Sequence, residues 1–279
     1  GPGGAIDTWL RRGAAGFRLD VADELPDEFI EKVRAAVKRV SPEKFLLGEV
    51  WEDATTKFGF NKRRTYLLGK GLDSVMNYPF KNAVLDFVKG KPAEQAMTEI
   101  LTICEHYPAP AMDTALNFLS THDTERALTV IADEPANGRG RAWQSGRCVT
   151  GDAYEEGLLR LRMAYAIIYT LPGVPCLYYG DEIAMQGYRD PFNRAFFRWD
   201  AHEQRLRPVL AQLAQLRHTC EAFRTGQLRV LRAEDGILHY QRVGKVETAE
   251  IIVNRTEHII VETLASGKST EVNPMGFTI

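Results

Sequence analysis

Residues 16–50 read GFRLDVADELPDEFIEKVRAAVKRVSPEKFLLGEV, and the apolar residues of this stretch predict a strand, a helix and a second strand. The apolar segments Phe17–Val21 and Phe45–Val50 have the length and composition of buried strands. Between them, after Pro26, apolar residues recur at helical spacing: Phe29, Val33, Val37 and Val40. Two strands joined by a helix form a βαβ unit, which is the building block of a parallel sheet.

The same alternation continues to about residue 222. It predicts further short strands at 72–77, 115–120 and 174–179, and helices at about 80–89, 92–106, 155–171 and 206–216. Short strands that are apolar on both faces and alternate with helices fit an α/β fold of the (β/α)8 TIM barrel type better than a half-exposed sheet. Since a closed barrel needs eight strands, we expect a partial barrel over residues 1–222.

From about Phe223 the pattern changes to short segments of alternating polarity that are separated by turn residues. These segments lie at 228–230, 237–241, 250–253 and 258–261. Alternation of this kind is typical of antiparallel strands with one buried face. The sequence therefore predicts a second unit, a small antiparallel β domain over residues 223–279.

Composition excludes several classes of partner. The chain has 35 basic and 37 acidic residues, a formal net charge of −2 and no basic stripe, so we expect no nucleic acid partner. The longest apolar run, Ala164–Leu171, is too short to cross a bilayer, so no membrane partner is expected. The four cysteines lie far apart and show no zinc-ligand spacing, which argues against a zinc site or a disulfide framework.

Three acidic residues are placed at the carboxyl ends of predicted strands. Asp20 and Glu49 lie near the ends of the first two strands, and Asp123 directly follows the strand at 115–120. In a barrel the carboxyl ends of the strands meet at one face, so the three acids predict one shared site. Arg18 lies two residues before Asp20 on the same face of its strand; a structural ion pair between these two is the alternative interpretation.

Glycoside cleavage needs two carboxyl groups in opposite protonation states. The guanidinium of Arg18 favours the charged form of Asp20, whereas the chain neighbours of Glu49 are apolar and favour its protonated form. This contrast predicts Asp20 as the nucleophile and Glu49 as the general acid/base.

Four blocks of the sequence resemble those of the α-amylase family, glycoside hydrolase family 13, and within it the group of neopullulanases, cyclomaltodextrinases and maltogenic amylases. They are GFRLD at 16–20, GEVW at 48–51, FLSTHD at 118–123 and PGVPCLYYGDE at 172–182. In order, they are similar to the family's nucleophile block, acid/base block, third-acid block and eighth strand. The resemblance implies that the chain holds about strands 4 to 8 of the barrel, followed by the C-terminal domain.

The resemblance also implies a role for each matching residue. Asp20 would form the covalent intermediate, Glu49 would protonate the glycosidic oxygen, and Asp123 would hold hydroxyls of the distorted sugar. The substrate-binding residues would be Arg18, which orients Asp20, together with His122, Trp51, Glu24, Asp190 and Arg194. For Asp190 and Arg194, a salt bridge that stabilises their loop is the alternative.

The implied substrate is an α-glucan oligosaccharide or a cyclodextrin. No cofactor or metal is assigned to this segment, because the family's first motif, which often uses an Asn for calcium, has no match before Gly16. The resemblance allows calcium and a homodimer in a complete enzyme, and it leads us to expect that this chain alone is truncated and inactive.

Two other functions stay open on the sequence. A metal-dependent TIM-barrel enzyme also gathers carboxylates at strand ends, although Arg18 beside the acids opposes a dication. A non-catalytic amylase-like carbohydrate-binding protein is the second alternative, although all three acids are present.

Overall fold

Short parallel strands lie at the centre of the N-terminal part, in a computed structural model that describes residues 2–279. Their neighbours in space follow chain order, since β1 pairs with β2, β2 with β5, and β6 with β7, all in parallel. A parallel bridge between Met76 and Leu116 links β5 to β6. The strands are β1 (Gly16–Leu19), β2 (Phe45–Gly48), β5 (Ser74–Val75), β6 (Leu116–Asn117) and β7 (Val174–Pro175). Their carboxyl ends therefore point to one edge.

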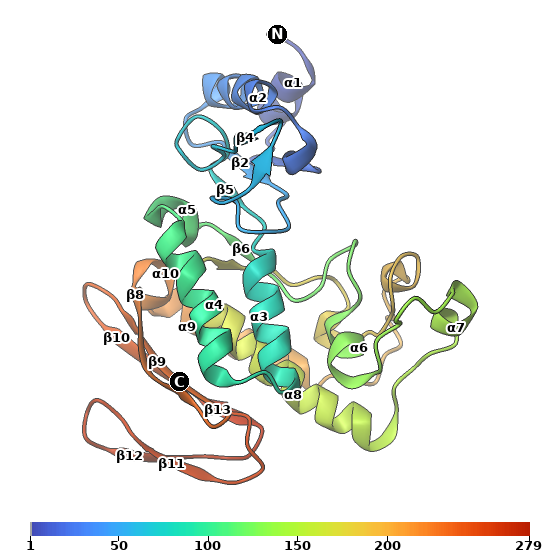
Figure 1. Cartoon of the computed structure of the whole chain (residues 1–279), viewed down its shortest axis with the longest axis vertical. Coiled ribbons are helices and arrows are strands. Elements are labelled where there is room, and N and C mark those ends of the chain that lie inside the picture. Colours follow the sequence, from blue (N-terminus) through green and yellow to red (C-terminus); the bar gives the residue numbers. More distant parts are fainter. Residues whose placement is uncertain (1) are drawn as a thin grey trace.

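Long helices connect and cover these strands, as the apolar periodicity predicts (Figure 1). On α2, which joins β1 to β2, Val33 and Val37 of the predicted stripe are buried together with Ile30, whereas the predicted Phe29 is 49% exposed because the buried face begins one residue later. Helix α8 is buried on several sides, which explains its nearly continuous apolar sequence. The long helices are α2 (Asp27–Val40), α3 (Tyr78–Lys89), α4 (Ala93–His106), α8 (Gly151–Thr170) and α9 (Leu206–Thr219), and the shorter α1 (Ala5–Arg11) precedes them.

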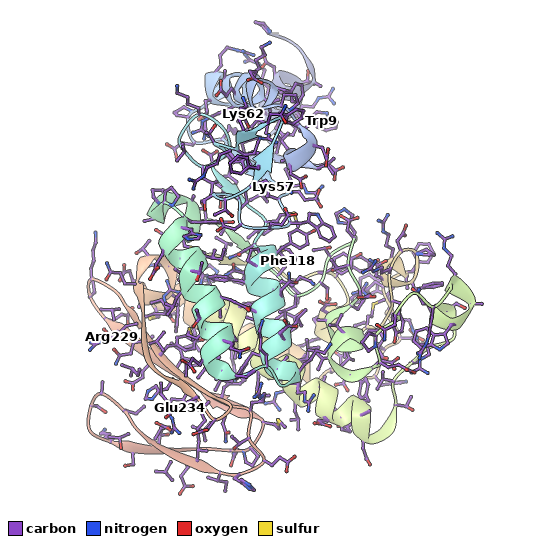
Figure 2. The ribbon with its side chains drawn as sticks, in the orientation of Figure 1. Trp9, Lys57, Lys62, Phe118, Arg229 and Glu234 are labelled. Carbon is purple, nitrogen blue, oxygen red and sulfur yellow. The ribbon has the colours of Figure 1, made fainter. Side chains whose placement is uncertain are left out.

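The C-terminal part is an antiparallel sheet with the strand order β13-β10-β9-β8, beside a hairpin of β11 and β12. Figure 1 shows it beside α4 and α10, and Figure 2 labels Arg229 and Glu234 on β8. Its apolar side chains, such as Tyr240 and Ile251, belong to the same hydrophobic cluster as those of the helices. The strands are β8 (Gln227–Glu234), β9 (Ile237–Val243), β10 (Thr248–Asn254), β11 (Ile260–Thr263), β12 (Ser269–Val272) and β13 (Gly276–Thr278).

The two predicted units are thus packed on a common core, and their division at residue 222 stays a prediction. The buried Arg242 of β9 reinforces the contact, because its guanidinium donates to the carbonyl of Thr170 at the end of α8 at 2.6 Å. No helix within residues 2–279 combines the length and apolarity needed to cross a membrane.

The structure differs from the predicted elements mainly after the strands. The predicted strands at 72–77, 115–120 and 174–179 shrink to pairs of residues, because the chain turns away to form loops at their carboxyl ends. Short elements with too little apolar periodicity were not predicted. They are β12, β13, the β3–β4 hairpin (Phe58–Gly59 and Lys62–Arg63), α5 (Ala109–Asp113), α6 (Ala127–Ala132), α7 (Arg141–Ser145), α10 (Ala222–Thr225), η1 (Ala22–Glu24), η2 (Asp181–Ile183) and η3 (Phe192–Arg194).

Candidate active site

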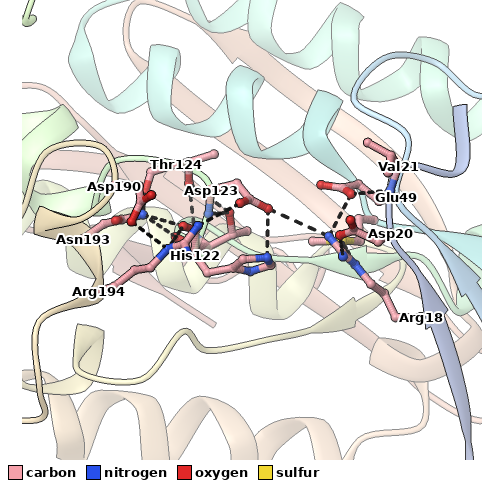
Figure 3. Close-up of polar contacts among 12 residues, drawn as sticks. Arg18, Asp20, Val21, Glu49, His122, Asp123, Thr124, Asp190, Asn193 and Arg194 are labelled. Atoms are coloured by element: carbon pink, nitrogen blue, oxygen red, sulfur yellow. Dashed lines mark hydrogen bonds and ion pairs between the residues drawn. The ribbon is translucent and has the colours of Figure 1, made fainter. Parts of the chain in front are cut away.

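The three predicted acids converge on one guanidinium, that of Arg18 in β1 (Figure 3). Its Nη1 forms an ion pair with Asp20, which directly follows β1. Its Nη2 lies 3.0 Å from Oε2 of Glu49, which follows β2, and 4.0 Å from Oδ2 of Asp123, which lies beyond β6. The parallel strands thus bring together residues that are far apart in the sequence.

The surroundings of Glu49 differ from the apolar environment that its chain neighbours predict. The Val21 N–H donates to its Oε2 at 2.8 Å, Trp51 Nε1–H donates to its Oε1 at 3.1 Å, and the Tyr78 hydroxyl donates to Oε1 at 3.4 Å. That prediction is wrong because Val21 and Tyr78 bring donors from other segments of the chain, and because the neighbouring Trp51 turns its polar N–H toward the carboxyl group. Solvent exposure, rather than an apolar environment, is what distinguishes Asp20 from Glu49. The side chain of Asp20 is 72% exposed, and that of Glu49 is only 4% exposed.

The backbone at Val21 is strained where it meets Glu49. Val21 has φ 43° and ψ 47°, a left-handed conformation that a β-branched residue rarely adopts. This conformation leaves 46% of Val21 exposed and directs its N–H to the Glu49 carboxylate. Strain of this kind persists where the surrounding structure fixes it, and here it helps to place Glu49.

Besides its ion pair with Arg18, Asp123 contacts the neighbouring His122 and the loop that follows β7. His122 Nε2 lies 2.9 Å from Asp123 Oδ2, and Arg194 Nη2 lies 3.3 Å from Asp123 Oδ1 (Figure 3). Arg194 Nε also pairs with Asp190 Oδ1 at 3.2 Å, so the predicted pair of Asp190 and Arg194 reaches the third acid. The Asn193 amide supports this arrangement by donating to the carbonyl of His122 at 2.8 Å.

A buried ion pair fixes the same two loops relative to each other. Arg126 Nη1 lies 3.0 Å from Asp181 Oδ1, and their side chains are 0% and 2% exposed. Arg126 also donates to the carbonyls of Tyr179 and Asn193, and the Tyr165 hydroxyl donates to Asp181 at 2.8 Å. Burial raises the pKa of Asp181, with Arg126 opposing the shift. The loops that carry Asp123 and Arg194 are thereby tied together.

We predict that Arg126→Met lowers the free energy of unfolding by about 3–5 kcal/mol, because it leaves the buried Asp181 without its cation. Urea denaturation followed by circular dichroism measures the change. The double variant Arg126→Met with Asp181→Asn is the control, and it should be less destabilised than Arg126→Met alone because no unpaired charge remains. Equal unfolding of wild type and Arg126→Met would rule out this role.

An aromatic stack borders the site beside Glu49. The rings of Trp51 and Tyr78 are parallel within 13°, with centroids 4.4 Å apart, and the Tyr78 ring meets Phe118 edge to face. Phe118 is labelled in Figure 2, close to α3. Trp51 is 44% exposed and so keeps surface available for a ligand. Burial raises the pKa of the Tyr78 hydroxyl, which stays protonated and acts as a donor.

One predicted residue lies apart from this cluster, and others belong to it without having been predicted. Glu24 is exposed at the end of η1, and within residues 2–279 its side chain makes no hydrogen bond or ion pair with the site. The contributions of Tyr78 and Arg126 were missed. Tyr78 directly follows the third predicted strand, so the rule that located the acids also applied to it, whereas nothing in the sequence marks the partner of Arg126.

The comparisons with known proteins identify the family. The sequence matches the family described as alpha amylase, catalytic domain, over residues 4–226. A cyclomaltodextrinase from Geobacillus thermopakistaniensis is 33% identical over 255 residues, which cover 89% of this chain and 38% of that protein. Neopullulanase 2 from Thermoactinomyces vulgaris is 31% identical over 271 residues, which cover 94% of this chain and 41% of that protein.

Solved structures show the same likeness. The ligand-free cyclic α-maltosyl-(1→6)-maltose hydrolase from Arthrobacter globiformis superposes with a TM-score of 0.82 at 25% identity, covering 98% of this chain and 56% of that one. By the coverages given for the cyclomaltodextrinase and neopullulanase 2, this chain spans about two fifths of the length of those two relatives. Because the family match extends over most of the chain and includes every acid that meets Arg18, this protein belongs to the α-amylase family.

Proposed function

We propose that this chain carries the catalytic acids of a retaining α-glycoside hydrolase that acts on α-1,4 and also α-1,6 glucans, maltooligosaccharides or cyclodextrins. The observation that carries the proposal is the convergence of Asp20, Glu49 and Asp123 on Arg18. The names of the relatives, cyclomaltodextrinase and neopullulanase among them, support an α-glucan as the substrate class.

In the proposed mechanism Asp20 attacks the anomeric carbon of the sugar while Glu49 protonates the departing glycosidic oxygen. Glu49 then takes a proton from water, and that water releases the sugar from Asp20. The exposed carboxylate of Asp20 is accessible to a sugar carbon, and Arg18 orients it. Asp123, supported by His122, is placed to accept hydrogen bonds from hydroxyls of the same sugar.

Glu49 is placed for proton transfer by its contacts and its burial. Its carboxyl group lies 3.0 Å from the Arg18 guanidinium and accepts a hydrogen bond from the Val21 N–H, and its side chain is only 4% exposed. A glycosidic oxygen that reaches Glu49 therefore meets the proton donor at a position with little access to water.

We further propose that the parallel strands are about strands 4 to 8 of a (β/α)8 barrel and that the chain alone is inactive. Two facts support this. The chain spans 38% and 41% of the two relatives named above, and among residues 2–279 neither the outer edge of β1 nor that of β7 has a partner strand. Calcium and a homodimer belong to the proposal only for a complete enzyme.

We predict retention of anomeric configuration. Asp20 and Glu49 bind neighbouring nitrogens of one guanidinium, which suits the carboxyl separation of about 5–5.5 Å in retaining enzymes rather than the wider gap of inverting ones. The measurement is proton NMR of the first product formed from maltotriose, using this chain joined to the upstream half of a close relative. The α-anomer should appear first. Initial release of the β-anomer would contradict the proposal.

A further inference from the structure

A basic hairpin packs against the acidic loop that follows the proposed nucleophile. Residues 57–64, which contain β3 and β4, read KFGFNKRR, and residues 22–28, which contain η1, read ADELPDE. Lys62 Nζ lies 3.3 Å from Asp27 Oδ2 and 2.9 Å from Glu28 Oε1. Opposite charges therefore join a segment of the β2–β5 connection to the loop between β1 and α2.

Arg64, which directly follows β4, is the buried cation of this contact. Its side chain is 0% exposed. Its Nε donates to Asp27 Oδ1 at 2.7 Å, its Nη1 donates to the carbonyl of Asp23 at 2.8 Å, and its Nη2 donates to the carbonyl of Leu25. All three nitrogens of the guanidinium thus donate to residues 23–27, a use that suits its planar fork of donors.

Two aromatic rings lie against this guanidinium. The centroid of the Phe60 ring lies 5.2 Å from the Cζ atom of Arg64, and that of the Tyr66 ring lies 4.4 Å from it. Phe60 and Asn61 form the two-residue loop of the hairpin with φ values of 53° and 58°, as in a type I′ turn. A left-handed conformation is costly for a bulky residue and persists where other contacts fix it. The hairpin therefore presents Arg64 in one fixed position.

η1 needs contacts from elsewhere because it is a single turn. It spans Ala22–Glu24, and no side chain caps its N-terminus. A helix this short has little stability of its own, and the carbonyls at its C-terminus have no partner within it. Arg64 supplies donors to two carbonyls there, those of Asp23 and Leu25. We infer that Arg64 holds this turn in place.

The same turn brings two backbone donors to Glu49. Its N-cap is the strained Val21, whose N–H donates to Glu49 Oε2 at 2.8 Å (Figure 3), and the Ala22 N–H donates to the Glu49 carbonyl at 3.1 Å. The Glu24 N–H donates to the Val21 carbonyl at 2.9 Å, so the turn helps to keep Val21 in its left-handed conformation. A chain of contacts thus runs from the hairpin through η1 to Glu49.

We propose that Arg64 is a positioning residue for Glu49, which acts by holding η1 so that the Val21 N–H stays on the carboxyl group. The proposal rests on the function proposed above, in which Glu49 protonates the glycosidic oxygen. Loss of Arg64 should lower the rate of the chemical step more than the affinity for substrate, because a displaced proton donor affects the transition state rather than the bound ground state.

The test compares Arg64→Met and Arg64→Lys with Lys62→Met. Arg64→Met removes every contact of the guanidinium. Arg64→Lys keeps a cation for Asp27, but a single ammonium lacks the planar fork that reaches both carbonyls. Lys62→Met is the matched control, because Lys62 also lies in the hairpin and pairs with Asp27 but contacts neither carbonyl.

Two measurements are made on each variant. In the chain of residues 1–279, hydrogen exchange with mass spectrometry reports the protection of the peptide that contains Val21 and Ala22. Both Arg64 variants should exchange there about 10- to 150-fold faster, the equivalent of a lost hydrogen bond from a charged group. In the chain joined to the upstream half of a close relative, both should lower kcat for maltotriose by about 10- to 100-fold and leave KM nearly unchanged. Lys62→Met should change none of these values.

Equal exchange of this peptide in wild type and Arg64→Lys would overturn the inference, and so would faster exchange with an unchanged kcat. Faster exchange in α8 as well, in Arg64→Lys, would show a purely structural role and would overturn it too. Failure of the proposed function gives a different result. Exchange would then depend on Arg64 as expected while the joined wild-type protein hydrolysed nothing, so the contact would stand and its role in catalysis would fall.

Discussion

Asp20→Asn and Glu49→Gln should each abolish most hydrolysis of maltooligosaccharides while leaving the fold intact. Both changes keep the shape of the side chain and remove one chemical role, that of the nucleophile or that of the proton donor. Loss of general acid/base catalysis costs about 10²–10⁴-fold in rate, and loss of the nucleophile should cost at least as much because no covalent intermediate can form. The assay uses this chain joined to the upstream half of a close relative.

Two exposed acids provide matched controls for these variants. Asp152→Asn on α8 and Glu31→Gln on α2 make the same chemical changes at acids that have no hydrogen-bond or ion-pair partner in residues 2–279. Both controls should retain activity, and circular dichroism should give the same spectrum for all variants. Loss of activity in the controls would show that the assay reports stability rather than catalysis.

The same experiment separates the two alternative functions. A metal-dependent enzyme would lose activity with EDTA, regain it with Mg²⁺ and tolerate Glu49→Gln. A non-catalytic carbohydrate-binding protein would bind α-glucans and hydrolyse none of them, with or without Asp20. Arg18 already weighs against the metal, because it contacts Asp20, lies 3.0 Å from Glu49 and would repel a dication there.

Patterns along the chain were enough to predict that the three acids meet, although the predicted Glu24 lies apart from them. The βαβ alternation and the position of each acid at a strand end predicted that Asp20, Glu49 and Asp123 share a site, because both depend on local sequence and on the geometry of parallel strands. The lengths of β5, β6 and β7 could not be predicted in the same way. Strand length depends on partners that are remote in sequence, and two-residue strands leave little periodicity.

The contacts that surround a site residue were harder to predict from the sequence than its position at the end of a strand. The surroundings of Glu49 were misjudged because its ion-pair partner Arg18 and two of its hydrogen-bond donors, Val21 and Tyr78, come from the segments of β1 and β5, which are distant from it in the sequence. Arg126 was missed for the same reason, because its partner Asp181 lies 55 residues further along the chain.

The chain of residues 1–279 alone should be at least about 10²–10³-fold less active than the same chain joined to the upstream half of a close relative, the loss that follows removal of one transition-state donor. The outer edges of β1 and β7 have no partner among the described strands, and Val21 and Val174 near them are 46% and 41% exposed. Water therefore reaches the site from the open side and weakens the electrostatic effect of Arg18 on the acids.

The same edges should also make the isolated chain prone to self-association, because unpaired backbone groups and apolar side chains on an edge strand invite pairing with another copy. Turnover of maltooligosaccharides and cyclodextrin, measured beside light scattering at several protein concentrations, tests both expectations. The joined protein should be monodisperse over a wider concentration range and should turn over both substrates. Comparable turnover by an isolated, monomeric chain would refute this reasoning, since the site would then be complete without any strand beyond β1 or β7, and the acids gathered on Arg18 would suffice for catalysis.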